Sequence, residues 1–297
     1  EARALKHFQE KIVMKTRMKQ WCNCLVFVAA SSCVSAFQLT TAKRVANGGL
    51  FSAIPSDVSS TDKTLEDLKE DLISLCAGSS KPSLDDVRSA VRELEDKAEQ
   101  IGIGQSSSLS GLMNGEWELL FSPEDTTRSS PFFWAFRKAF PDQSDQIFGI
   151  TDAIPPPVKE VGPAFQTITM DDTRMGTFVS RVKVATLGGA ATSIMTTRGS
   201  ITGIDGVDGL KIRVDTTKPE DSTIVKTLLG PLAAVVNENL PPFPSGEALE
   251  RIQPGSSQVT MRSTFCDEGL RISRNDDRHS DVFVWRRKGF PTTDVFQ

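Results

Sequence analysis

Tyrosine is absent from the chain, and histidine occurs only twice, as His7 and His279. Both residue types often act as general acids or bases, and histidine is also a common metal ligand. No glycine-rich phosphate loop precedes an expected helix, and no serine has a plausible histidine partner, so nucleotide binding and serine-histidine catalysis lack support. We therefore expect a protein that is not an enzyme and that uses no cofactor or metal.

Cysteine is scarce in the part of the chain expected to fold. Three of the five cysteines, Cys22, Cys24 and Cys33, lie in the first 56 residues, which leaves Cys76 and Cys266. Two cysteines so far apart give neither a disulfide framework nor the spacing of a metal site. This usage is consistent with a reducing compartment.

An excess of positive charge is also missing. The formal net charge is −4, but residues 1–56 contain eight basic and two acidic residues, so the other 241 residues carry 26 basic and 36 acidic groups, a net charge of −10. Nucleic-acid binders neutralise phosphates with basic side chains, and this acidic body argues against that class. With 38% hydrophobic and 24% charged residues, the chain has a folding composition.

The longest apolar run lies near the start, where the basic stretch Met14–Gln20 precedes the apolar stretch Trp21–Ala36. Small residues at the end of that stretch complete the pattern of a secretory signal peptide. A membrane anchor is the alternative, although the run is short for a bilayer. Residues 37–56 contain Lys, Arg, Ser and Thr but no acid, as transit peptides do. We expect residues 1–56 to be upstream sequence plus a removable or disordered leader.

The junction Ser35-Ala36-Phe37, followed here by Gln38-Leu39, resembles the bipartite plastid presequence of diatoms and other algae with secondary plastids. The resemblance implies that the mature protein works in a plastid.

Residues 57–104 are expected to form a helical hairpin. Leucines recur at helical spacing over Thr64–Cys76, and Ser83 supplies a capping signal for a second amphipathic helix. Gly78–Pro82 separates the two helices, and Gly102 ends the second.

From Gly115 onward the hydrophobic period changes to two. Apolar and polar residues alternate over 117–121, 178–184, 210–214 and 259–265, with Gly-Gly and Asp-Gly turns between strands. About eight or nine strands in one meander favour an antiparallel barrel, and a closed barrel of that size can enclose one small ligand. The expected fold is thus mainly β, a barrel preceded by a helical hairpin.

The barrel domain is expected to span 105–297, with insertions at 128–160 and 216–256. The first contains the aromatic segment Pro131–Phe140, and the second contains the apolar stretch Leu228–Val236. As a helix, the aromatic segment could contact a membrane surface or a partner, or it could pack on the barrel wall. Its candidate contact residues are Phe132, Phe133, Trp134, Phe136 and Phe140.

Gly115-x-Trp117 at the start of the first strand is similar to the opening signature of lipocalin-type barrels. There the Trp plugs one end of the barrel, and Arg271 or Arg286 could lie over its indole. The other interpretation is an ordinary core tryptophan.

Several blocks occur in one order, namely Gly115–Ser122, Ser130–Trp134, Pro241–Gly246, Asp267–Arg274 and Val282–Arg286. This ordered set resembles the plastid lipid-associated protein family, also called plastoglobulins or fibrillins, over roughly Thr64 to Lys288. The resemblance implies a lipocalin-like barrel, a home on thylakoids or plastoglobules, and binding of quinones, carotenoids or other isoprenoid lipids, mostly without catalysis. The positions that match its C-terminal motif are Asp267, Glu268, Leu270, Arg271 and Arg274.

If the barrel binds a lipid, inward-facing apolar side chains would form the wall and an arginine would contact the head group. The candidates for the wall are Trp117, Phe121, Phe165, Phe178, Val182, Ile212, Met261 and Phe265, and those for the head group are Arg262 and Arg271.

Two acidic groupings invite a chemical interpretation. Asp267 and Glu268 could form a catalytic pair, but adjacent turn residues point apart, so we expect a turn whose carboxylates pair with Arg271 and Arg274. His279 has three aspartates nearby, yet a lone histidine in a polar loop lacks convergent ligands and is expected to be solvated.

The favoured function is therefore lipid binding at a stroma-facing thylakoid or plastoglobule surface. The alternative is a non-catalytic scaffold that grips a plastid enzyme or photosystem partner. A lipid carrier needs an apolar cavity, whereas a scaffold needs a filled barrel and an exposed apolar patch.

Overall fold

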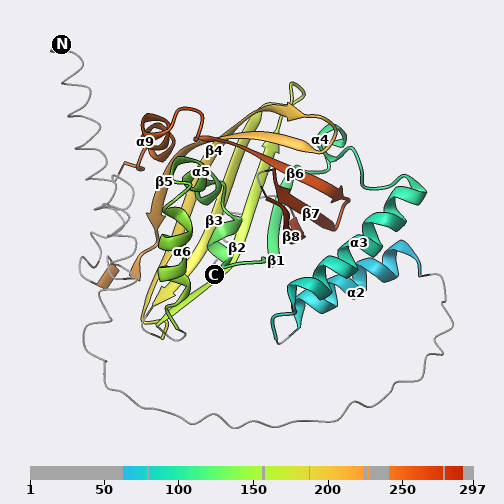
Figure 1. The fold of residues 1–297 in the computed structure, drawn as a ribbon, viewed down its shortest axis with the longest axis horizontal. Helices are drawn as coiled ribbons and strands as arrows, with labels where there is room; N and C mark the ends of the chain where they lie inside the picture. Colours follow the sequence, from blue (N-terminus) through green and yellow to red (C-terminus); the bar gives the residue numbers. More distant parts are fainter. Residues whose placement is uncertain are drawn as a thin grey trace, which may run out of the picture.

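A computed structural model of the chain describes residues 63–78, 80–155, 158–186, 188–223, 226–227, 230, 241–276 and 278–289. The leader expected in residues 1–56, the apolar side chains of Leu228–Val236 and the side chain of His279 lie outside the described residues. In the described part, eight antiparallel strands form one sheet whose hydrogen bonds close into a ring (Figure 1).

Each strand pairs with the next along the chain, and β8 pairs with β1. The strands are β1 (Gly115–Phe121), β2 (Lys159–Met170), β3 (Gly176–Thr186), β4 (Ala191–Asp205), β5 (Gly209–Glu220), β6 (Gln258–Cys266), β7 (Leu270–Asn275) and β8 (Arg278–Gly289). The expected mainly β, antiparallel barrel-like fold with a preceding helical hairpin is confirmed.

The hairpin consists of α2 (Leu65–Ala77) and α3 (Leu84–Ile101). Thr64 begins α2 with a reciprocal capping box, and the Ser83 hydroxyl accepts a backbone N–H of the first turn of α3. Gly102 ends α3 in the left-handed conformation, at φ 71°, where a residue without Cβ is favoured.

The apolar stripes of both helices pack on the outer face of the sheet. The shared cluster includes Leu72, Val91, Leu94, Phe265, Leu270 and Ile272. Charged groups at its edge add directional contacts: both guanidinium Nη atoms of Arg274 donate to the carboxylate of Glu95, and Lys69 pairs with Asp267. The hairpin is thus tied to β6 and β7 by packing and by ion pairs.

The other helices belong to the connections between strands. They are α4 (Ser107–Ser110), the 3₁₀ helix η1 (Thr126–Ser129), α5 (Pro131–Ala139), α6 (Ser144–Asp152) and α9 (Ser245–Ile252). Helices α5, α6 and α9 lie on the side of the sheet away from the hairpin (Figure 1). Helix α5 packs against α9, β5 and β6, and its Trp134 joins the interior cluster around Trp117 and Met261.

Two β-bulges change which aromatic side chains face the interior. Trp117 and Leu119 belong to the interior cluster, but the register shifts before Phe121, which packs against the hairpin instead. In the same way Met261 faces inward, whereas Phe265 lies beyond a shift in β6 and faces outward. A bulge adds one residue to a strand and so reverses the alternation of its side chains.

Candidate functional site

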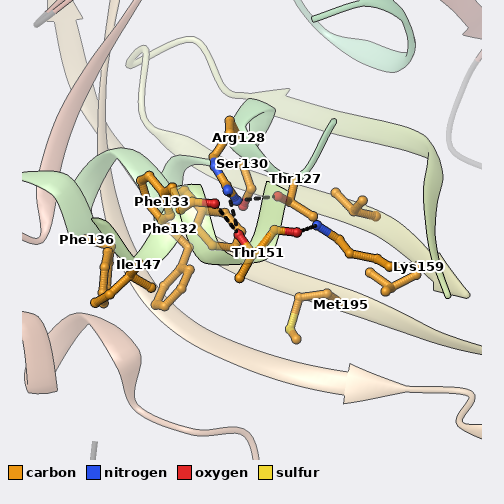
Figure 2. Close-up of a pocket in the computed structure, with 13 residues that line it drawn as sticks. Thr127, Arg128, Ser130, Phe132, Phe133, Phe136, Ile147, Thr151, Lys159 and Met195 are labelled. Atoms are coloured by element: carbon orange, nitrogen blue, oxygen red, sulfur yellow. Dashed lines mark hydrogen bonds between the residues drawn. The ribbon is translucent and has the colours of Figure 1, made fainter. Parts of the chain in front are cut away.

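A cavity of about 130 Å³ lies between the η1–α5–α6 segment and the inner faces of β3 and β4. We call it the barrel-mouth cavity. Its helical wall includes Phe132, Phe133, Phe136, Ile147 and Phe148, and its strand wall includes Val182, Val184 and Met195. Figure 2 shows the helical phenylalanines and Ile147 gathered on one side, with Met195 on another. Because the accessible walls are mainly apolar, the cavity suits a hydrocarbon group.

A hydrogen-bonded polar network borders the cavity (Figure 2). Arg128 Nη2 donates to Asp152 Oδ1 at 2.8 Å and to the Thr151 hydroxyl at 3.0 Å. Lys159 Nζ donates to Asp125 Oδ2 at 2.8 Å and to the carbonyl of Thr151 at 3.2 Å. Each cation therefore has a carboxylate partner, and the network ties the end of α6 to η1 and β2.

Burial sets the electrostatics of this network. Desolvation lowers the pKa of Arg128, although Asp152 acts in the opposite direction. Burial alone would raise the pKa of Asp125, but hydrogen bonds from Lys159 and Thr127 outweigh it, and the pKa lies below the usual value. The Arg128 guanidinium carbon lies 3.9 Å from the centre of the Phe148 ring, a close cation–π contact. Helix α6 is thus held by one stacked ring and one ion pair.

Helix α5 turns its aromatic side chains toward the protein. Phe132, Trp134 and Phe136 are buried, and Phe133 and Phe140 are partly buried against the interior cluster. The Trp134 indole N–H donates to the carbonyl of Arg128 at 2.6 Å. In this structure the segment takes the packed alternative, so a membrane or partner meets Phe132, Trp134 and Phe136 only if α5 moves, whereas Phe133 and Phe140 keep some exposed surface.

The opposite end of the barrel is closed around Trp117. Its indole N–H donates to the carbonyl of Met113 at 2.8 Å, and the guanidinium carbon of Arg287 lies 4.2 Å from the ring centre. Arg287 also donates to the backbone carbonyls of Leu112, Asn114 and Glu268. Arg286, one of the two arginines expected over this indole, instead pairs with Glu118.

Arg271, the other expected arginine, lies inside the barrel between two indoles. Its guanidinium carbon is 5.0 Å from the ring of Trp117 and 4.9 Å from that of Trp285, and the side chain is fully buried. One Nη donates to Gln166, while Nε and the other Nη have no hydrogen-bond partner among the described residues. Burial lowers the pKa of Arg271 to about 9.

The structure divides the other candidates for lipid contact between two faces. Trp117, Phe178, Ile212 and Met261 face the interior, as does Val182, which lines the barrel-mouth cavity. Phe121 and Phe265 pack against the hairpin, and Phe165 alternates with inward-facing Gln166 and so lies on the outer face. Arg262 is also outside, where it pairs with three aspartates, Asp205, Asp208 and Asp276.

The C-terminal motif joins the hairpin to the barrel. Asp267 Oδ1 accepts the backbone N–H of Leu270 at 2.7 Å, and its other oxygen pairs with Lys69. The expected pairing of this turn with Arg271 and Arg274 is therefore wrong, because Arg271 points into the barrel and Arg274 reaches α3.

Much of the cavity was not anticipated from the sequence. Val184 continues the alternation of Val182 and could have been added on that ground. Met195 lies opposite Val182 only through the register of β3 and β4, and Phe148 and Lys159 are brought in by the path of the first insertion. No local pattern signals such long-range contacts.

The two described cysteines, Cys76 and Cys266, are free and buried. Burial raises the pKa of Cys76 to about 12 and that of Cys266 to about 11. Within the described ranges, no three His, Cys, Asp or Glu side chains are grouped to hold a metal. Among the described helices, none combines the length and apolarity needed to cross a membrane.

Comparison with known proteins gives one result. A family model described as PAP_fibrillin matches residues 66–285, well over half of the 297-residue chain. No match was found among curated proteins or among solved structures.

Proposed function

The chain belongs to the PAP_fibrillin family, and from this premise we propose that it is a plastid lipid-associated protein whose barrel-mouth cavity holds part of an apolar lipid. The ligand would be an isoprenoid-type lipid, such as a quinone or carotenoid, or another apolar lipid. Its place of action would be a stroma-facing thylakoid or plastoglobule surface, and its role would be binding or sequestration rather than catalysis.

The observation that carries this proposal is the barrel-mouth cavity itself. Its apolar walls come from two parts of the chain, the inserted helices and the strands. Ligand sites commonly combine apolar walls with a few orienting polar groups, and here the Arg128–Lys159 network supplies polar groups at the edge.

The volume limits how much of a lipid fits. A buried apolar cavity of about 150 Å³ holds a molecule the size of benzene. A cavity of about 130 Å³ therefore takes one end or one short segment of a lipid. The remainder would extend out of the cavity, or α6 would move to enlarge it.

The scaffold alternative gains less support from the same geometry. A scaffold would bind its partner through the apolar face of the aromatic helix or of the hairpin, and both faces pack toward the barrel. Within the part of the chain that the structure describes, the exposed large apolar residues are Ile101, Ile103, Leu109, Ile150, Met175 and Val207.

Organic extraction of the purified full chain, followed by mass spectrometry, tests the proposal. We expect a lipid in a near-stoichiometric amount, and protein denatured before the same purification serves as the control for adsorbed lipid. Recovery of no lipid from protein isolated out of plastid membranes would contradict it.

A further inference from the structure

Trp117 contacts two arginines, Arg287 and Arg271, which have different hydrogen-bond partners. Arg287 donates to several backbone carbonyls at the end of the barrel that is closed around Trp117. Arg271 sits on the interior side, with no exposed surface, and forms no ion pair with a carboxylate in the described part of the chain. Burying a guanidinium group is energetically costly unless a negative charge lies nearby and its N–H donors are hydrogen-bonded. Closing the end of the barrel at Trp117 therefore does not explain why Arg271 is buried.

Arg271, its partner Gln166 and the neighbour of Gln166 in the sheet, Ser180, form a polar layer between the end of the barrel closed by Trp117 and the cavity. Gln166 accepts from Arg271 and donates to the carbonyl of Ser129 at 2.9 Å. Ser180 lies directly opposite Gln166 in the sheet, and its buried hydroxyl has no hydrogen-bond partner among the described residues.

This layer lies close to the barrel-mouth cavity. Ser180 precedes Val182 by two residues on the same inner face of β3, a separation of roughly 7 Å along a strand. Ser129, the partner of Gln166, directly precedes Ser130 at the cavity wall. A molecule with its chain in the cavity therefore needs to extend by only a few atoms to reach the layer.

We propose that Arg271, Gln166 and Ser180 bind the carboxylate head of a long-chain acid whose hydrocarbon chain passes through the barrel-mouth cavity and extends out of it. The proposal rests on the proposed lipid-binding function and names the chemistry of the head group. A carboxylate only accepts hydrogen bonds, so it matches the unused donors of Arg271 and Ser180 and supplies the missing negative charge.

The other cations near the cavity do not compete for this head group. Arg128 and Lys159 already pair with Asp152 and Asp125. The unused donor atoms of Arg271 and Ser180 are covered in this structure. The head group therefore reaches them only when side chains below the cavity shift aside.

Displacement of Nile red, a neutral apolar dye, tests the proposal on the full chain. Oleate and methyl oleate have the same hydrocarbon chain and differ in the charge of the head group. The ratio of the concentrations at which they displace the dye therefore measures the contribution of the carboxylate. A charge-assisted hydrogen bond to a buried arginine predicts that oleate displaces the dye at a concentration about ten- to a hundredfold lower.

Three variants locate the effect. Arg271→Met should reduce the affinity for oleate to the level of the affinity for methyl oleate, and the affinity for methyl oleate itself should not change. Ser180→Ala removes a hydroxyl without a described partner, so the fold is kept and the preference for oleate should fall severalfold. Arg213→Gln, at an exposed site on the outer face, is the matched control and should keep the native ratio.

The outcomes separate this proposal from the one on which it rests. Equal displacement by oleate and methyl oleate from the native protein overturns the carboxylate site and leaves lipid binding intact. Failure of both ligands, together with an extraction that yields no lipid, overturns lipid binding itself. If Arg271→Met does not fold, the displacement ratio of the native protein and that of Ser180→Ala still test the proposal. A ratio in Ser180→Ala equal to that of the native protein would show that Ser180 does not bind the head group.

Discussion

At the scale of single residues, the cations beside the cavity are neutralised by specific partners. Asp125 is held ionised mainly by hydrogen bonds from Lys159 and Thr127, against the opposing effect of burial. A carboxyl group with a lowered folded-state pKa stabilises the fold above its unfolded pKa of about 4. That contribution is lost as the pH falls through the folded-state pKa.

Asp125→Asn should therefore lower the free energy of unfolding by about 1–3 kcal/mol at pH 7, because Lys159 loses its partly buried carboxylate partner. The difference from the native protein should shrink below about pH 4 as Asp125 itself becomes protonated. Urea unfolding at a series of pH values measures both quantities. The exposed Asp142→Asn is the control, and a gap that stays constant down to acid pH would disprove the ionic origin of the effect.

Gly104 is a second residue whose identity is dictated by its surroundings. Its φ is +82°, and a Cβ there would lie 2.5 Å from the ring of Phe265. Gly102 has a similar φ of +71° but no atom within 4 Å of its would-be Cβ.

Gly104→Ala should accordingly destabilise the protein by about 2–4 kcal/mol, since backbone strain and a clash add together. Gly102→Ala carries the strain alone and should cost about 1 kcal/mol. Equilibrium urea denaturation of the two variants gives the comparison. Equal losses would mean that the ring of Phe265 moves aside freely.

At the scale of elements, the hairpin is joined to the barrel by the C-terminal motif. The Glu95–Arg274 pair is partly buried and uses both carboxylate oxygens, a geometry stronger than that of an exposed ion pair. The motif therefore has a structural role at the contact of α3 with β6 and β7.

Glu95→Gln should reduce the free energy of unfolding by about 1–2 kcal/mol, because one charged partner of Arg274 is lost. Glu247→Gln, in an exposed pair with Arg251, should change it by less than about 0.5 kcal/mol. Thermal or urea unfolding distinguishes the two. A loss no larger than that of Glu247→Gln would show that apolar packing alone holds the hairpin.

The strands and the helical hairpin could be predicted from the sequence more fully than the residues of the barrel-mouth cavity. Period-two runs and helical leucine spacing arise from local burial and thus indicate the strands and the hairpin. The bulges before Phe121 and Phe265 reverse side-chain direction without a clear local signal, which is why two expected wall residues lie outside. The position of α5 and α6 depends on contacts distant in sequence.

At the scale of the whole molecule, helices cover opposite sides of a closed sheet. The hairpin packs on the outer face, and α5 and α6 lie on the side away from it (Figure 1). Both of these helices line the barrel-mouth cavity. The aromatic helix, the feature of the sequence that most suggested an exposed contact, instead contributes to the wall of the site.

The central claim is that a lipid occupies the barrel-mouth cavity, and lipid stoichiometry in a pair of matched variants tests it most directly. Met195→Trp places a bulky ring into the cavity, whereas Met175→Trp makes the same change in an exposed turn. Native protein and Met175→Trp should yield the same amount of co-purified lipid by extraction and mass spectrometry, and Met195→Trp should yield several times less. Equal lipid in all three, with Met195→Trp folded as judged by circular dichroism, would contradict the account.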